Sequence, residues 1–240
     1  GMEPIVATDG ADVFTCNAYL VDGETPTLID AGTMPGVADV IADHVADLDR
    51  VVLTHQHGDH VGELDAVLDR FDADLYAYAD HPRRTVAIDD GDSVAIGDDE
   101  FDAIHTPGHA SDHLSLVSDR ALFSGDVVVY NDGAFDDGSF GRTDRRGQSR
   151  ERLIESLERI LDSLPDSVSA MYAGHGDPFR AEPAGDNVRT VIERALERAE
   201  RREPKYPDGG SRSGEVTRGL CSVSPTATVS LFEHRRQRCR

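Results

Sequence analysis

Apolar residues in the first part of the chain recur with two spacings, one typical of strands and one typical of helices. Five short apolar runs predict strands at residues 5–7, 18–21, 27–29, 51–53 and 75–78. Between and after them, apolar residues spaced three and four apart predict helices over 37–45 and 61–71. Strands therefore alternate with helices in this part of the chain.

The pattern then changes to a run of strands. Residues 93–130 alternate short apolar runs with turn residues, which is typical of an antiparallel meander. A helical stripe from Leu153 to Leu164 ends at Pro165, a strand follows at 168–172, and a last helix spans 188–199. Because the strands come in two batches, each followed by helices, we expect an α+β fold with two sheets packed face to face and helices outside.

The composition changes after Glu203. Residues 205–240 contain seven basic and three acidic side chains, are rich in Ser, Gly, Pro and Thr, and show little periodicity. Such a segment has too few apolar residues to offset the entropy of folding. We therefore predict one domain over residues 1–203 and a basic, disordered tail over 204–240.

The protein is strongly acidic, with 46 Asp and Glu against 24 Lys and Arg and a net charge of −22. Lys205 is its only lysine. This charge repels nucleic acids and anionic membranes, so neither is expected as a partner. Many carboxylates with few lysines resemble the halophilic proteins of salt-loving archaea, in which salt screens the repulsion. An acidic protein of an ordinary organism is the alternative.

Two further features bear on the compartment. No apolar run approaches the ~18 residues of a membrane helix, and the N-terminus lacks the basic-then-apolar pattern of a signal peptide, so we expect a cytoplasmic protein. Cys16, Cys221 and Cys239 show no CxxC spacing, which predicts neither a disulfide framework nor a cysteine zinc site. For Cys16 we expect a small buried side chain rather than a reactive thiol.

The densest group of candidate metal ligands is the run THQHGDH at residues 54–60, directly after an apolar run. His55 and His57 are two residues apart, so in an extended chain they point the same way. Asp59 and His60 follow a glycine that can turn the backbone. Imidazole and carboxylate suit Zn²⁺ and also Fe or Mn. A polar loop with chance histidines is the alternative, which this spacing disfavours.

Three more candidates stand at the ends of later apolar runs. They are His109 in TPGH, Asp126 in SGD and His175 in GHG. Each lies beside glycine, where the backbone can approach a metal closely. Taken alone, each is typical of a turn or capping residue.

In chain order, the segments LIDAG (28–32), THQHGDH, TPGH, SGD and GHG resemble the five motifs of the metallo-β-lactamase superfamily. The resemblance extends from residue 13 to residue 180. It implies a four-layer αββα sandwich with the site at the sheet edges. It also implies two zinc ions, with Fe or Mn as alternatives, each held by three ligands: His55, His57 and His109 for the first, and Asp59, His60 and His175 for the second. Asp126 would bridge the two ions, and Asp30 would orient the ligands from behind.

This ligand set predicts a hydrolase. Two metal ions lower the pKa of a shared water, which gives hydroxide near neutral pH. Asp59 or Asp126 would orient that hydroxide while one ion polarises the substrate carbonyl. A thiolate leaving group would need no strong general acid.

The substrate is indicated by GSFGRTD at residues 138–144, which looks like the GxxGRxD segment of short glyoxalase II-like proteins. That likeness favours a small acyl-thiol, or a related ester, as the substrate. Arg142 is then a candidate for binding an anionic part of the substrate, and an ion pair with a neighbouring Asp is the alternative. A full glyoxalase II has a larger C-terminal helical domain with basic residues that bind glutathione. The sequence after 203 does not resemble it, so glutathione itself is disfavoured.

Three other functions stay open. A persulfide dioxygenase has a similar fold but uses one iron held by two His and one Asp, and the retained second ligand set disfavours it. An endoribonuclease-like member of the superfamily is disfavoured by the acidic charge. A metal-binding protein without catalytic activity is disfavoured by the complete ligand set.

Overall fold

The computed structural model describes residues 3–183 and 185–206, which form two six-stranded sheets, one two-stranded sheet and five helices. The first sheet follows chain order: β1 (Ile5–Val6), β2 (Tyr19–Val21), β3 (Thr27–Ile29), β4 (Arg50–Val52), β5 (Asp74–Ala77) and β6 (Val86–Ala87). The second has the order β14 (Phe179–Arg180), β13 (Ala170–Ala173), β10 (Ala121–Gly125), β9 (Leu114–Val117), β8 (Asp99–His105) and β7 (Ser93–Ile96). The small sheet pairs β11 (Val128–Val129) with β12 (Ser139–Phe140).

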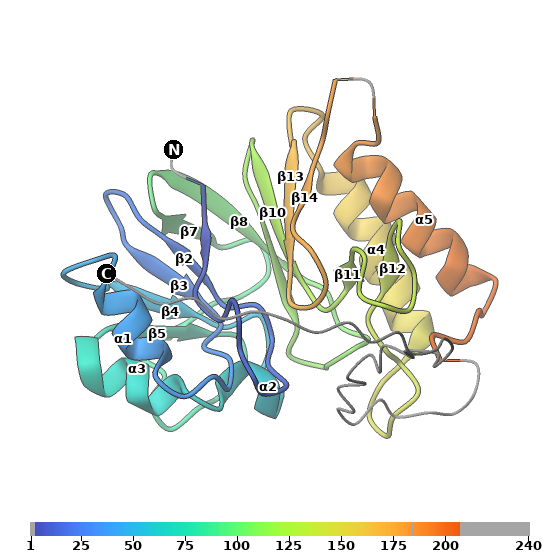
Figure 1. Ribbon diagram of the computed structural model, residues 1–240. Helices are drawn as coiled ribbons and strands as arrows, with labels where there is room; N and C mark the ends of the chain where they lie inside the picture. Colours follow the sequence, from blue (N-terminus) through green and yellow to red (C-terminus); the bar gives the residue numbers. More distant parts are fainter. Residues whose placement is uncertain (1–2, 184, 207–240) are drawn as a thin grey trace, which may run out of the picture. The chain divides into compact units, whose positions relative to one another are not determined.

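The helices form the two outer layers. They are α1 (Val37–Ala42), α2 (Gly58–Val61), α3 (Leu64–Phe71), α4 (Arg150–Ser163) and α5 (Val188–Glu200). Figure 1 shows α1 and α3 outside the first sheet and α4 and α5 outside the second. The predicted αββα sandwich is therefore confirmed. Every helix in the described part of the chain is too short or too polar to span a lipid bilayer.

The alternation of side chains along each strand explains the layers, because successive residues of a strand point to opposite faces. Ile29 and Phe123 lie in the core between the sheets. Their neighbours point outward: Leu28 joins the core under α1 and α3, and Leu122 joins the core under α4 and α5. Full burial of each such side chain stabilises the fold by about 1.5–3 kcal/mol. Three apolar layers thus fix the register of both sheets.

Strand direction decides where the loops meet. β3, β4 and β5 are parallel to one another, and β10 is parallel to β13. β8 is antiparallel to β9, which is antiparallel to β10, so β8 runs the same way as β10. The carboxyl ends of each parallel set therefore reach the same edge of their sheet.

The helix predicted over 61–71 corresponds to α3, which begins at Leu64, and Val61 is instead the last residue of the separate helix α2. The chain leaves helical geometry between them because the amide of Glu63 donates to the carbonyl of Gly32 (2.8 Å). A Cβ on Gly62 would lie 2.7 Å from the side chain of Thr33, so this close approach requires glycine. The break turns α2 toward the sheet edge, independently of α3.

The first residues of the predicted tail lie against the domain. Lys205 is buried, with its Nζ 2.6 Å from Asp132 Oδ2, and it donates to the carbonyl of Phe140. A buried ammonium is tolerated when it is paired in this way. The tail from residue 207 onward lies outside the described residues, so its disorder stays a prediction.

Candidate metal centre

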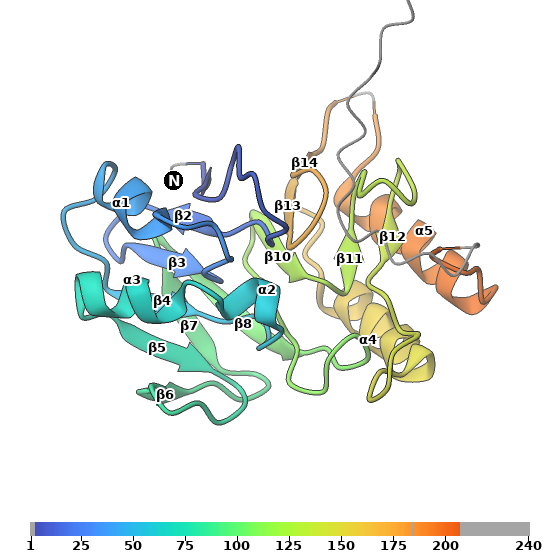
Figure 2. The same cartoon turned by 60° about the horizontal axis from the view of Figure 1, so that its bottom comes forward.

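Five candidate residues lie in the loops that leave the carboxyl ends of strands, within four residues of the strand end. Asp30 follows β3, His55 follows β4, His109 follows β8, Asp126 follows β10 and His175 follows β13. Because these strand ends share one edge of the sandwich, the loops bring residues far apart in sequence into one place. The other three candidates lie at α2: His57 immediately precedes it, and Asp59 and His60 are within it. Figure 2 shows α2 on this edge, which is turned forward in that view.

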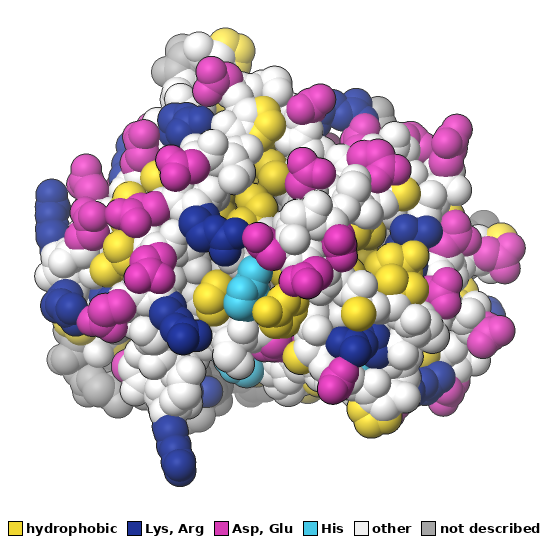
Figure 3. Space-filling model, turned by 180° about the vertical axis from the view of Figure 1, so that it is seen from behind, with side chains coloured by type: hydrophobic (Ala, Val, Ile, Leu, Met, Phe, Trp, Pro, Cys, Tyr) yellow, Lys and Arg dark blue, Asp and Glu magenta, His cyan; other side chains and the backbone are white. Residues whose placement is uncertain are grey.

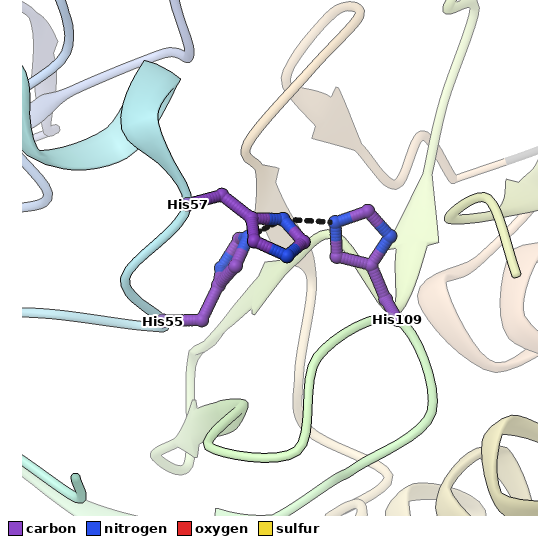
Figure 4. Close-up of side chains that lie close together, drawn as sticks. All are labelled: His55, His57 and His109. Atoms are coloured by element: carbon purple, nitrogen blue, oxygen red, sulfur yellow. Dashed lines mark hydrogen bonds between the residues drawn. The ribbon is translucent and has the colours of Figure 1, made fainter. Parts of the chain in front are cut away.

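His55, His57 and His109 form the first group of possible metal ligands. His55 Nε2 lies 3.1 Å from His57 Nδ1, and His57 Nδ1 lies 3.0 Å from His109 Nε2. Figure 4 shows the three rings turned toward one another, two from the loop before α2 and one from the loop after β8. Ligand nitrogens about 2.0–2.1 Å from a tetrahedral zinc ion have closely similar spacings. We call these residues the three-histidine group.

The hydrogen bonds behind two of these rings select their tautomers. His109 Nδ1 donates to the carbonyl of Arg142 (2.8 Å), so its Nε2 carries a lone pair. Thr54 Oγ1 donates to Asp30 Oδ2 (2.7 Å) and therefore accepts from His55 Nδ1 (3.1 Å). Both inward-facing Nε2 atoms are thus lone-pair donors that can bind a cation.

Asp59, His60, Asp126 and His175 form the second group, which we call the acidic group. His175 Nε2 lies 2.9 Å from Asp59 Oδ2 and 3.4 Å from Asp126 Oδ2. His60 Nδ1 donates to Asp30 Oδ2 (2.8 Å), which leaves His60 Nε2 facing the group. Carboxylate and imidazole together make a donor set suited to a divalent cation.

Asp126, a member of the acidic group, also lies close to the three-histidine group. Its Oδ2 lies near the Nε2 atoms of four histidines: His109 at 3.2 Å, His60 and His175 at 3.4 Å, and His55 at 3.9 Å. Among the described residues, Asp126 Oδ1 and His60 Nε2 are buried without a hydrogen-bond partner. Buried polar atoms are nearly always satisfied. These two therefore fit a site in which metal ions supply the missing partners.

The two groups differ in protonation. Burial holds the pKa of His55 well below its usual value, and burial with the neighbouring His109 lowers that of His57. Burial opposes the charge of His175 as well, but the carboxylates of Asp126 and Asp59 raise its pKa to about 9. His55 and His57 are therefore neutral bases, whereas the acidic group is an array of opposite charges.

The pKa of the Asp126 carboxyl itself is far below its usual value. Burial would raise that pKa, but the charges of His175 and His60 and the hydrogen bond from His175 outweigh burial. Asp126 is therefore an anion, as a bridging carboxylate must be.

Asp30 lies behind both groups. Its Oδ1 accepts from the backbone amide of Thr54 (2.8 Å), and its Oδ2 accepts from Thr54 Oγ1 and His60 Nδ1. It has a positive φ of 57°, which Asp tolerates better than most residues. One buried carboxylate thus contacts His60 directly and His55 through Thr54.

His113 has a structural role that the sequence did not reveal. His113 lies outside both groups but is fully buried. Its Nε2 accepts the backbone amide of Asp126 (2.9 Å), and its Nδ1 donates to Thr106 Oγ1 (2.8 Å). Burial lowers its pKa to about 3, so the ring stays neutral and can accept that bond.

Two glycines allow the close packing around Asp126. Gly125 has a φ of 52°, and a Cβ there would lie 2.4 Å from His113 Nε2. A Cβ on Gly174 would lie 2.2 Å from Asp126 Oδ1. The glycines beside the ligands are thus required by contact, as expected from the sequence.

Arg142 forms an ion pair with a neighbouring aspartate. Its Nε and NH2 donate to the two carboxylate oxygens of Asp144 at 2.7 and 2.9 Å. This is the ion pair with a neighbouring Asp that the sequence left as the alternative. Cys16 is buried, as predicted, and burial raises its pKa to about 11, so its thiol is protonated.

A cavity of about 460 Å³ opens beside the three-histidine group. Its lining includes His57, Asp59 and His109, together with residues 110–112 and 145–148. A volume of this size is typical of a small-molecule site. We call it the site cavity.

The geometry agrees with comparison to known proteins. The family model described as Metallo-beta-lactamase superfamily matches residues 11–85 and 75–175. The chain is 29% identical over 151 residues to the Hydroxyacylglutathione hydrolase of Aliivibrio fischeri, which covers 62% of this chain and 56% of that protein. It is also 29% identical over 137 residues to the Probable polyketide biosynthesis zinc-dependent hydrolase PksB of Bacillus subtilis, which covers 54% of this chain and 57% of that protein.

Among solved structures, that of ETHE1 from Myxococcus xanthus matches with a TM-score of 0.63 and 25% identity. The match covers 82% of this chain and 83% of that chain. The two curated relatives are longer than the region they share with this chain, since little more than half of each is matched.

Proposed function

Because the chain belongs to the metallo-β-lactamase superfamily, we propose that it is a metal-dependent hydrolase that acts on thioesters. The position of Asp126 carries this proposal. One carboxylate oxygen within 3.2–3.9 Å of four imidazole nitrogens from both groups is placed to bridge two cations. A single-metal site would not need a second complete set of ligands around the same oxygen.

The donors favour zinc, with Fe or Mn as alternatives. His55, His57 and His109 would hold one ion, and Asp59, His60 and His175 the other, with Asp126 between them. Such a pair of ions supplies a water of lowered pKa and an electrophile for the carbonyl oxygen.

The protein's own groups then position the reactants. Asp59 lines the site cavity and accepts a hydrogen bond from His175. The pKa of Asp59 is lowered, since that bond and the charges of His60 and His175 outweigh burial. Asp59 therefore remains an anion that can accept a hydrogen bond from the attacking water and orient it toward the substrate.

A thioester is the substrate class supported by two observations. Residues 138–144 have the GxxGRxD pattern of glyoxalase II-like proteins, and one relative is named as a hydroxyacylglutathione hydrolase.

The test combines metal content with turnover. Purified protein is loaded with zinc, iron or manganese in high-salt buffer, and hydrolysis of an S-lactoyl thiol is followed by thiol release. We expect about two ions per chain and metal-dependent hydrolysis. His57→Ala should abolish turnover. His44→Ala is the matched control, because His44 is exposed and lies outside both groups.

Other results would replace the proposal. One iron per chain with O₂ consumption on a persulfide substrate would indicate a dioxygenase. Cleavage of RNA without thioester turnover would indicate a nuclease. Full metal occupancy with no turnover of any ester, thioester, lactam or RNA would indicate a binding protein.

A further inference from the structure

The site cavity brings two arginines to the candidate metal ligands. Arg145 and Arg146 lie in the loop between β12 and α4 and line the same cavity as His57, Asp59 and His109. Both side chains are exposed. A substrate whose scissile bond meets the ligands would therefore have its remaining part within reach of two guanidinium groups.

The loop that carries them is tied to the metal centre. Gln148 Nε2 donates to the carbonyl of His109 (2.9 Å), and the amide of Ser149 donates to the carbonyl of Gly108 (2.9 Å). Within the loop, Arg145 and Gln148 exchange two bonds: the amide of Arg145 donates to Gln148 Oε1 (3.0 Å), and the amide of Gln148 donates to the carbonyl of Arg145 (3.1 Å). These bonds fix the backbone at Arg145 relative to His109.

These two arginines differ from most arginines of the domain in their ion pairing. Eleven arginines form ion pairs with carboxylates, among them Arg142 with Asp144 and Arg159 with Asp90. In residues 3–183 and 185–206, no carboxylate pairs with Arg145 or Arg146. Arg50, Arg70, Arg150 and Arg152 also lack such a pair there, but of these six arginines only Arg145 and Arg146 line the site cavity. The chain has a net charge of −22, and Figure 3 shows acidic side chains over much of one face.

Two acidic residues, Asp59 and Asp112, also line the cavity. Asp59 forms an ion pair with His175, and Asp112 accepts the backbone amide of Gln56 (3.1 Å). Unpaired guanidinium groups in an otherwise acidic surface attract anions and select them at that point.

We propose that Arg145 and Arg146 bind an oxyanion of the substrate, a carboxylate or a phosphate, at a distance from the scissile bond. The substrate class is then an anionic thioester, and this statement rests on the proposed function. Arg145 and Arg146 take the role that the sequence suggested for Arg142, because Arg142 already forms an ion pair with Asp144.

Binding tests the subsite without any reaction. Three S-ethyl thioethers, which cannot be hydrolysed, are compared by calorimetry on the metal-loaded protein: those of mercaptopropionate, mercaptopropionamide and mercaptoethyl phosphate. We expect at least one anionic thioether to bind about tenfold more tightly than the amide. A hydrogen bond to a charged group in a partly enclosed site contributes a gain in affinity of this size. The better of the two anions identifies the oxyanion.

Two double variants separate anion binding at the subsite from the general electrostatic attraction between the protein and an anion. R145Q/R146Q should remove the preference for the anion. R70Q/R201Q removes the same charge from exposed arginines of α3 and of the residue after α5, outside the cavity lining, and should retain the preference. All measurements are made at one salt concentration, because salt screens exposed charges.

Hydrolysis of the three corresponding S-acetyl thioesters distinguishes the two proposals. Turnover of all three with equal kcat/KM, together with equal thioether binding, overturns the anion subsite and leaves thioester hydrolysis standing. Selective anion binding without turnover overturns the proposed function and leaves the subsite standing. An equal loss of binding in both double variants would also overturn the subsite.

Discussion

The three-histidine group and the acidic group lie at the same edge of the sandwich, yet the fold prepares them differently. Hydrogen bonds to Thr54 and to the carbonyl of Arg142 fix the ring orientation of His55 and His109, whose inward nitrogens are neutral. In the acidic group, His175 and Asp59 form an ion pair instead. The first group attracts a cation through oriented lone pairs, and the second mainly through negative charge.

Asp126 lies between the three-histidine group and the acidic group. Because these groups attract a cation in different ways, the position of the Asp126 carboxylate must be closely fixed. Its backbone amide is held by His113, and Gly125 and Gly174 leave room for its close contacts. A carboxylate shared between unlike groups must be placed to a few tenths of an ångström, because a shift toward one group weakens the other. Single substitutions separate the contributions of the two groups.

Asp126→Asn should have the largest effect. The amide keeps the size of the side chain but removes the shared anion, so turnover should fall by at least about a thousandfold. Metal content should fall in both groups. Steady-state kinetics and elemental analysis of the same preparation check this, and activity within tenfold of the wild type would rule out a bridging role.

His57→Ala and His175→Ala test the two groups against each other. Each variant should retain about one tightly bound ion per chain, since the other group keeps its ligands. Metal titration followed by dialysis measures the retained ion. If either variant lost both ions or kept both, the two groups would not be separate sites.

Asp30→Ala should affect the groups unequally. The substitution removes the acceptor of the hydrogen bond from His60 Nδ1, whereas Asp30 reaches His55 only through Thr54. Metal affinity of the acidic group should fall about 10–100-fold, with a smaller change in the three-histidine group. Competition with a chromophoric chelator reports both affinities, and equal losses would contradict the asymmetry.

Phe14→Ala should have the smallest effect. Phe14 is 72% exposed, and its ring is stacked on that of His175 at 5.4 Å. Losing this aromatic contact, worth about 0.5–1.5 kcal/mol, should lower the metal affinity of the acidic group about two- to tenfold, measured by chelator competition, and leave that of the three-histidine group unchanged. Val13→Ala is the control, because Val13 is its exposed neighbour and cannot stack on the ring. Equal effects of the two substitutions would show that the contact with His175 does not matter.

Much of the fold was readable from the sequence because strand alternation and strand ends carry direct physical signals. Leu28 and Ile29 point into different cores, and this follows from the two-residue period of a strand. The strand-end positions of His109 and Asp126 were visible as ligand residues after apolar runs. The family resemblance then added the order of the layers, which periodicity does not contain.

Other features depend on contacts distant in sequence, which spacing does not encode. His113 is four residues after His109 in a polar segment, and nothing local indicates that its ring is buried against the amide of Asp126. Arg142, Arg145 and Arg146 are chemically alike in sequence, but only the first has Asp144 within reach. The break between α2 and α3 likewise results from a bond between Glu63 and Gly32.

A crystal structure of the metal-loaded protein, with anomalous scattering recorded at the metal edge, tests the shared role of Asp126 most directly. We predict two peaks, one among His55, His57 and His109 and one among Asp59, His60 and His175, each with a carboxylate oxygen of Asp126 at about 2.0–2.2 Å. A single peak, or two peaks with Asp126 bound to neither, would contradict the two-metal centre and the hydrolysis proposed for it.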